Sequence, residues 1–290
     1  MLNGIVVKVI KKLRDWIVPR EIRTFGVSEV ITQRTSIKSL PDSAEISLSF
    51  INFSFESITP KERQISGKTF LKCLFSHEVI ENFTFQDCTF LNCSFNGAVL
   101  LGTEFHDCEF RECFFYKAKF KDTYVDPATF HFSKKWHWIR ANVNSGLFQS
   151  LYNNSKTMHQ EEFAMRADRR FQFYRRYQYL YGDRPAIYSF LKALLFDYLL
   201  GYGYGIKNSL VVTVASIFGF AWILDDKIVS ENGTFFEALY FTVVSLTTVG
   251  YGEITPRHEV LPLAITIVLL LLSIAWCAVV TAIIVKRIVK

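Results

Sequence analysis

A five-residue period runs through the N-terminal half of this 290-residue chain. Every fifth residue from Phe70 to Phe130 is apolar, and ten of these thirteen positions are phenylalanine. Neither the 3.6-residue period of a helix nor the 2-residue period of a strand produces this spacing. A fixed internal period instead indicates stacked repeat units that bury their large side chains against one another. The positions are Phe70, Phe75, Ile80, Phe85, Phe90, Phe95, Leu100, Phe105, Phe110, Phe115, Phe120, Val125 and Phe130.

The residue two places before each large one is mostly small. Phe50 and Phe55 extend the same register, with a break expected around Pro60. This pattern resembles the pentapeptide-repeat family, which implies a right-handed quadrilateral β-helix with four repeats per coil. We expect this β-helix over residues 45–132, preceded by an N-terminal amphipathic helix and a cap or linker in residues 1–44. The small residues are Cys73, Cys88, Cys93, Ala98, Thr103, Cys108, Cys113, Ala118, Thr123 and Ala128.

Five of the six cysteines fall at these small positions, and those twenty residues apart would stack on one face. Metal binding and thiol sensing are the functional interpretations. The sequence contains no CxxC pair, and a buried cysteine also serves as a small hydrophobic residue. We therefore expect these cysteines to pack inside the repeat.

A second motif lies near the C-terminus, where residues 247–252 read Thr-Thr-Val-Gly-Tyr-Gly. Apolar segments of about 207–224 and about 260–286 flank it, and about 20 such residues cross a bilayer as a helix. The shorter segment of about 234–246 cannot span; Thr234 and Glu237 form a capping box at its start. Non-helical backbone at membrane depth is tolerated where it lines a cavity. The similar Gly-Tyr-Gly within residues 201–205 lacks this context and is expected to be a turn.

Residues 207–290 resemble the two-helix pore module of tetrameric potassium channels: outer helix, pore helix, filter and inner helix. The resemblance implies four subunits whose backbone carbonyls replace the water around K⁺. Glycine permits the backbone conformations that this requires, while Val249 and Tyr251 would face away and pack. The filter residues are Thr247, Thr248, Val249, Gly250, Tyr251 and Gly252; those expected to bind K⁺ are Thr248, Val249, Gly250 and Tyr251; those expected to support the filter are Tyr240, Phe241, Val244 and Glu253.

The chain departs from the family pattern in three places. Glu253 stands where Asp is common, and Val244 stands where some members carry a buried Glu. The usual carboxyl pair behind the filter is therefore absent, and slow inactivation is expected to differ. Residues 253–290 contain no hinge glycine, so Leu272→Gly is expected to raise open probability if the inner helix bends there. The candidate gate residues on the inner helix are Leu272, Ser273, Cys277 and Thr281.

Charge patterning orients the chain in the membrane. Lys and Arg crowd the stretch before residue 207 and return at residues 286–290, whereas the segment between the two spans carries Lys227 and Arg257. The positive-inside rule then places both termini in the cytoplasm. We expect a multi-pass protein of a bacterial plasma (inner) membrane. The net charge of +6 needs no nucleic-acid partner. No span carries the arginine run of a voltage sensor.

Residues 133–206 are expected to form a cytoplasmic helical connector that ends in an interfacial helix. Its arginines could bind anionic lipid headgroups, or simply line a solvated helix face. Residues 1–18 mix apolar and basic residues, which favours an amphipathic helix over a signal peptide. His131, His137 and His159 lack a ligand-like spacing. No ligand domain is expected after the inner helix, so regulators would act through residues 1–206.

The sequence therefore predicts a multi-domain membrane protein in which a pentapeptide-repeat β-helix precedes an all-α potassium-channel pore. It would be a homotetramer that conducts K⁺, with K⁺ as permeant ion, no cofactor and no enzymatic activity. The repeat module would serve assembly or gating. Two alternatives stay open: a weakly selective cation channel, and a membrane-anchored interaction scaffold with a non-conducting pore.

Overall fold

The computed structural model describes residues 33–40, 44–47, 51–56, 58–181, 186–203, 205–229 and 234–288. The expected helix of residues 1–18 lies outside them. The chain divides into two compact units, Met1–Ala193 and Leu194–Lys290.

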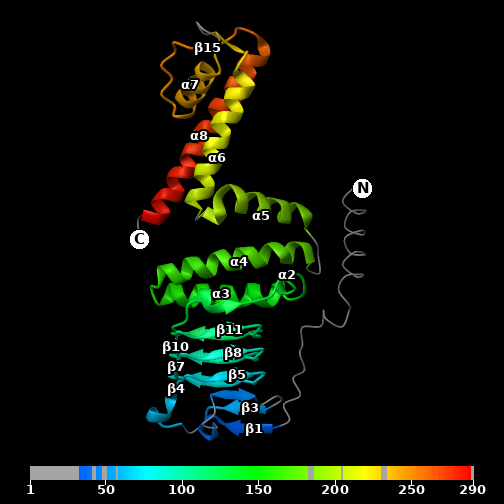
Figure 1. Cartoon of the computed structure of the whole chain (residues 1–290), viewed down its shortest axis with the longest axis vertical. Coiled ribbons are helices and arrows are strands. Elements are labelled where there is room, and N and C mark those ends of the chain that lie inside the picture. The colour runs from blue at the N-terminus through cyan, green and yellow to red at the C-terminus, as the bar shows by residue number, and fades with distance from the viewer. Residues whose placement is uncertain are drawn as a thin grey trace. The chain divides into compact units, whose positions relative to one another are not determined.

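Short strands fill most of the first unit, and long helices follow them along the chain (Figure 1). The strands are β1 (Gln33–Ser36), β2 (Glu45–Ser47), β3 (Ile51–Ser54), β4 (Gln64–Ser66), β5 (Thr69–Leu71), β6 (Val79–Glu81), β7 (Thr84–Gln86), β8 (Thr89–Leu91), β9 (Val99–Leu101), β10 (Glu104–His106), β11 (Glu109–Arg111), β12 (Lys119–Lys121), β13 (Phe130–His131), β14 (Ile228–Val229) and β15 (Thr255–Pro256). The helices are η2 (Ile37–Ser39), η3 (Pro60–Arg63), η4 (Pro127–Thr129), α2 (Trp136–Ile139), α3 (Ala141–Thr157), α4 (Glu161–Tyr181), α5 (Ile187–Leu200), η5 (Gly201–Gly203), α6 (Ile206–Leu224), α7 (Phe235–Leu246) and α8 (Val260–Ile288).

Strands β1–β13 form what we call the strand stack, in which short parallel strands lie above one another. From β4 onward the paired strands are parallel and offset by twenty residues, as β4 is with β7 and β7 with β10. The strands form one five-stranded, two three-stranded and one two-stranded sheet, the last made by β1 and β3. A column of single bridges through Asn52, Leu74, Ser94 and Phe114 makes a fourth side. Four sides and a twenty-residue offset are compatible with the quadrilateral β-helix that the sequence predicts.

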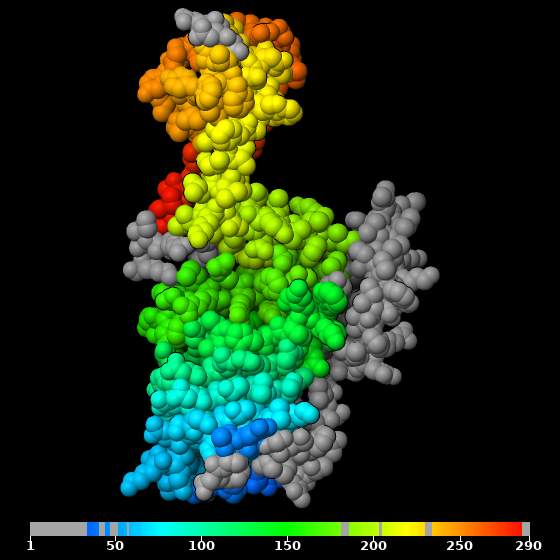
Figure 2. All heavy atoms as spheres, viewed as in Figure 1, coloured from blue at the N-terminus to red at the C-terminus, as the bar shows by residue number. Residues whose placement is uncertain are grey.

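The interior of the strand stack is a set of phenylalanine columns. Phe70, Phe90, Phe110 and Phe130 stack face to face with centroids 5.0, 4.9 and 4.6 Å apart. All thirteen positions of the five-residue period are buried, which confirms their predicted inward orientation. On the face visible in Figure 2, the side chains of successive coils meet closely. The five repeat cysteines are also buried, and none of them forms a disulfide.

A second five-residue register governs the backbone. Every fifth residue from Gly67 to Asp122 has a positive φ, and nine of these twelve residues are not glycine. Each lies two places after a large residue, and at nine of the twelve positions the N–H continues the ladder; that of Asn92, for example, donates to the Arg111 carbonyl at 2.9 Å. Asn and Asp tolerate this left-handed conformation better than most residues. The position therefore turns the chain at the end of each short strand.

In the first coil the predicted register is only partly correct: Phe55 is buried in the core, but it is not the residue that stacks on Phe75. Phe53, rather than Phe55, stacks on Phe75, with centroids 5.4 Å apart, and Asn52 bridges to Leu74 twenty-two residues later. The β2–β5 pairing is offset by twenty-four residues, as Ile46 faces Phe70. The coil therefore contains extra residues, of which η3 (Pro60–Arg63) is one visible part. Phe50 lies outside the described residues.

Helices α3 and α4 cover the β13 end of the strand stack. Leu147, Phe148 and Leu151 of α3 are buried in the same core as the phenylalanine columns. Asn154 fixes the last coil, because its side chain accepts from the Thr123 N–H at 3.1 Å and donates to the Thr123 carbonyl at 2.7 Å. An open end of stacked repeats exposes apolar surface, so a covering element of this kind stabilises it.

The second unit is built on two long apolar helices. Residues Ile206–Leu224 and Val260–Val285 are long and apolar enough to cross a membrane, with mean hydropathies of 1.6 and 2.8. The shorter helix α7 packs against both α6 and α8, and β14 pairs antiparallel with β15 beside it. The earlier Gly-Tyr-Gly forms η5, a kinked turn in which Tyr202 has a φ of 55°.

Candidate ion-conduction site

Helix α7 brings the glycine motif into the second unit. Thr234 is its N-cap, and the predicted capping box is present, with the Glu237 carboxylate accepting from the Thr234 N–H at 3.1 Å. Phe241 and Ala238 of α7 are buried with Leu224 of α6 and Leu269 of α8. This apolar contact fixes the helix between the two long helices and sets where residues 247–252 begin.

The backbone φ angles of the motif alternate between left-handed and ordinary values. Thr248, Gly250 and Gly252 have φ values of 60°, 59° and 88°, whereas Val249 and Tyr251 between them do not have positive φ. Two of the three left-handed positions are glycines, which adopt this conformation without the penalty that a Cβ brings. Thr248 does so as a non-glycine residue, which the motif alone did not indicate.

The first amide groups of the motif are directed at the end of α7. The N–H groups of Val249 and Gly250 both donate to the Val244 carbonyl, at 3.1 and 3.4 Å. Thr247 is the C-cap of α7, and its hydroxyl donates to the Val243 carbonyl at 2.8 Å. Hydrogen bonding thus ties the start of the loop to the carbonyl end of the helix, where the helix dipole favours a cation.

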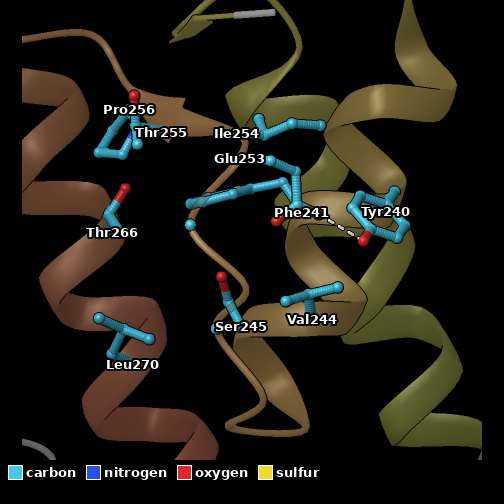
Figure 3. A pocket seen from close by; sticks show the side chains of 12 residues that line it. Tyr240, Phe241, Val244, Ser245, Glu253, Ile254, Thr255, Pro256, Thr266 and Leu270 are labelled. Atoms are coloured by element: carbon cyan, nitrogen blue, oxygen red, sulfur yellow. Dashed lines mark hydrogen bonds between the residues drawn. The ribbon is translucent and has the colours of Figure 1, made fainter.

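Figure 3 shows the region behind the motif, where the Tyr240 hydroxyl of α7 donates to the Glu253 carboxylate. These residues belong to the lining of a cavity of about 250 Å³, which Val244 and Phe241 line from α7 and Leu270 lines from α8. Because position 244 is valine, it adds no carboxyl group to this lining. The four residues predicted to support the filter therefore lie together, and one polar contact joins them.

The candidate gate residues lie along α8 in different environments. Ser273 is buried, and its hydroxyl donates to the Leu269 carbonyl at 2.7 Å, the back-bond that can bend a helix mildly. Cys277 donates to the Leu246 carbonyl at the end of α7, with a distance of 3.4 Å. Leu272 and Thr281 are exposed in the single chain. Ser273 and Cys277 therefore make hydrogen bonds within the chain, whereas the Leu272 side chain is exposed and does not share these contacts.

One contact between the long helices was not found from the sequence. The Trp276 indole N–H of α8 donates to the Thr213 hydroxyl of α6 at 2.8 Å. Both residues carry a polar group within an apolar segment, and such a group is the signal that could have pointed to a partner across the helices.

The basic residues predicted to meet lipid headgroups are largely engaged within the first unit. Arg166 pairs with Asp126 and Glu162, and Arg170 donates to the Phe130 carbonyl. Buried Arg176 stacks on Phe173 and Tyr177, but Arg169 and Arg175 are exposed. Among the described residues, no group of His, Cys, Asp or Glu could hold a metal ion.

Two comparisons match this part of the chain. Residues 210–290 match the family described as "Ion channel". A hyperpolarization-activated voltage-gated potassium channel of Methanocaldococcus jannaschii is 47% identical over 38 residues, which are 13% of this chain and 18% of that protein. Together with the two membrane-capable helices, these matches support a membrane protein with an ion channel domain rather than an enzyme.

Proposed function

We propose that residues 247–252 form a K⁺-selective filter in a pore built by four copies of this chain. The alternating hand of the backbone at Thr248, Gly250 and Gly252 carries the proposal. Carbonyl oxygens of such a loop substitute for the hydration shell of a dehydrated K⁺ ion. In this proposal K⁺ binds at Thr248, Val249, Gly250 and Tyr251, and K⁺ is also what the matched archaeal channel is named for.

Exposure in the single chain supports assembly around the motif. Val249 is 53% exposed and Tyr251 is 72% exposed, although both are large and the motif would lie at membrane depth. Phe236, on the first turn of α7, is 77% exposed. Contiguous exposed apolar groups mark surfaces that another chain or lipid covers. Packing between neighbouring copies would cover the side chains of the loop and leave its carbonyls for ions.

The test is ion flux through the purified full chain in liposomes. We expect Ba²⁺-sensitive K⁺ flux and a reversal potential that follows the K⁺ gradient in mixed K⁺ and Na⁺. Gly250→Ala should abolish flux, because its φ of +59° disfavours a Cβ even though nothing lies within 4 Å of it. Gly219→Ala in α6 is the matched control, since an added Cβ there also meets nothing and the backbone is helical.

The alternatives predict different results in the same experiment. A reversal potential near zero in mixed K⁺ and Na⁺ would indicate a weakly selective cation channel. An absence of flux, together with a protein partner captured by residues 1–193, would indicate an anchored scaffold. Equal flux in Gly250→Ala and Gly219→Ala would contradict the filter itself.

We also propose that the strand stack is a pentapeptide-repeat β-helix that serves assembly or gating. Its four-sided parallel pairing and its phenylalanine columns support the fold. Deleting residues 1–181 removes the strand stack and the helices that cover it as one piece. Altered tetramer yield or open probability is expected; normal tetramers with normal gating would refute the regulatory role.

The proposed orientation places both termini in the cytoplasm of an inner membrane. Helix α5 presents Tyr188, Leu191, Leu195 and Tyr198 as an exposed stripe at helical spacing, suited to a lipid surface. Contact with anionic headgroups would fall to the exposed Arg169 and Arg175. Flux in liposomes with and without anionic lipid, compared for Arg175→Gln and the parent chain, tests this contact.

A further inference from the structure

The first unit contains a cavity of about 350 Å³ that the channel proposal does not use. It lies where the strand stack meets the segment that leads into α2 and α3. Its volume falls within the range of about 300–1,000 Å³ that small-molecule sites occupy. The lining residues are Asn92, Glu112, Phe114, Ser133, Lys135, Trp136, Ile139 and Arg140.

Arg140 is the central group of this cavity. Its guanidinium lies 4.0 Å from the centroid of the Phe114 ring and 4.8 Å from that of Trp136. Stacking occupies the faces of a guanidinium but leaves the five N–H donors at its edge for acceptors. Among the described residues, no carboxylate forms a salt bridge with Arg140 within 4.0 Å and no hydrogen bond from its side chain is present. Burial lowers the pKa of Arg140, which the charge of Glu112 only partly opposes.

Of the other polar groups that line the cavity, Glu112 already has a hydrogen-bond partner within the chain, whereas Lys135 and Asn92 carry donors that a ligand could use. Glu112 already accepts from the Ser133 N–H, and its second oxygen lies 3.4 Å from the Ser133 hydroxyl. Lys135 and Asn92 are exposed at the rim and carry donors. Trp136 is buried and supplies an aromatic wall beside these donors. The cavity therefore combines two cations and an amide with flat apolar surfaces.

We propose that this cavity binds a small molecule that carries one anionic group, a phosphate monoester or a carboxylate, and one flat apolar group. The anion would accept from the edge of Arg140 and from Lys135, and the flat group would lie against the parts of Phe114, Trp136 and Ile139 that line the cavity beside the stacked guanidinium. Such a molecule would touch both the strand stack and α2, so its binding would tie these elements together. The site does not depend on whether the second unit conducts K⁺.

Calorimetric titration of the full chain in detergent tests the site, with phenyl phosphate as the probe. Inorganic phosphate and phenol are separate arms that present the anion alone and the ring alone. We expect saturable binding of phenyl phosphate that is tighter than that of either arm. Arg140→Gln should weaken it by about 10-fold or more, since a hydrogen bond to a charged group contributes about 1.5–3 kcal/mol. Lys119→Gln, at an exposed lysine of β12 outside the lining, should bind like the parent chain.

Because Arg140 also stacks on two rings, its removal could affect folding, and Lys135→Gln provides a second variant at an exposed position. Weakened binding in Lys135→Gln with an unchanged thermal midpoint would support the site. An absence of saturable binding up to about 10 mM, a range that still detects millimolar affinity, would overturn the proposal. Equal affinity of the parent chain, Lys135→Gln and Arg140→Gln would overturn it as well.

Discussion

Phe90 is the residue whose replacement tests the phenylalanine columns most directly. Its side chain is fully buried, and its ring stacks between Phe70 at 5.0 Å and Phe110 at 4.9 Å. Replacing a buried Phe by Ala costs about 3–5 kcal/mol, and each aromatic pair adds about 0.5–1.5 kcal/mol beyond burial. Phe90→Ala loses two stacked partners, so we expect a loss near the upper end, about 5 kcal/mol. If the exchange-competent open state recloses quickly, this loss corresponds to roughly a 4,500-fold acceleration of hydrogen exchange.

Hydrogen–deuterium exchange of the full chain in detergent, read by mass spectrometry on peptides of the strand stack, measures this loss. Phe120→Ala is the matched control, because Phe120 is 9% exposed and its ring meets Phe115 at 5.9 Å in a tilted contact. A cost of about 3 kcal/mol, or roughly 150-fold faster exchange, is expected there. If Phe90→Ala accelerates exchange no more than Phe120→Ala does, face-to-face stacking in the columns does not stabilise the strand stack.

Three further predictions concern the turns, the pore and pH. Gly97→Ala should destabilise the strand stack more than Gly67→Ala in thermal unfolding, because both have positive φ but only the first places a Cβ 2.5 Å from the His77 ring. Tyr240→Phe removes the hydroxyl that donates to the carboxylate after the filter and should speed the decay of K⁺ current; unchanged decay would count against this support. Burial, with nearby cations, lowers the pKa of His137 below 6.5, so unfolding takes up a proton and stability falls as pH drops below about 6.5. His137→Gln should flatten that pH dependence of the thermal midpoint, and an equal slope would refute it.

The repeat could be predicted from the sequence because its burial rule is local. Each large residue follows the last by five positions. In a coil of four equal sides, this spacing places one large side chain from every side in the interior. The rule fails where the spacing changes. Ile46, Phe53 and Ile65 are buried at irregular intervals, so a five-residue frame extended back from Phe70 selects Phe55 in place of Phe53. Extra residues in one coil do not follow the five-residue period. They are recognised only from the pairing of that coil with the next one.

The position with positive φ also recurs every five residues, but it is hard to recognise in the sequence because many residue types occupy it. Glycine occupies three of the twelve positive-φ sites, and Lys, His, Asn, Asp and Glu occupy the others. Asn and Asp enter this conformation readily, whereas Lys72 adopts it where its N–H donates to the Leu91 carbonyl of the next coil at 2.8 Å. Tertiary pairing therefore overrides local preference at these sites, and no single-residue rule would identify them.

The candidate pore is held by two kinds of contact: those between residues close in sequence, and those that form only when the helices pack together. The capping box of α7 is visible in the sequence because its two residues are three apart. The Tyr240–Glu253 and Trp276–Thr213 contacts join residues 13 and 63 positions apart, and depend on how helices pack. Within one chain two polar contacts already support the loop, since the Tyr240 hydroxyl donates to Glu253 and the Val244 carbonyl accepts from two amides. The apolar side chains of Val249 and Tyr251 remain uncovered. Hydrogen bonds can thus shape the loop before assembly, but burial of its side chains requires neighbours, so the order of the proposed filter should rise with the assembly of the four chains.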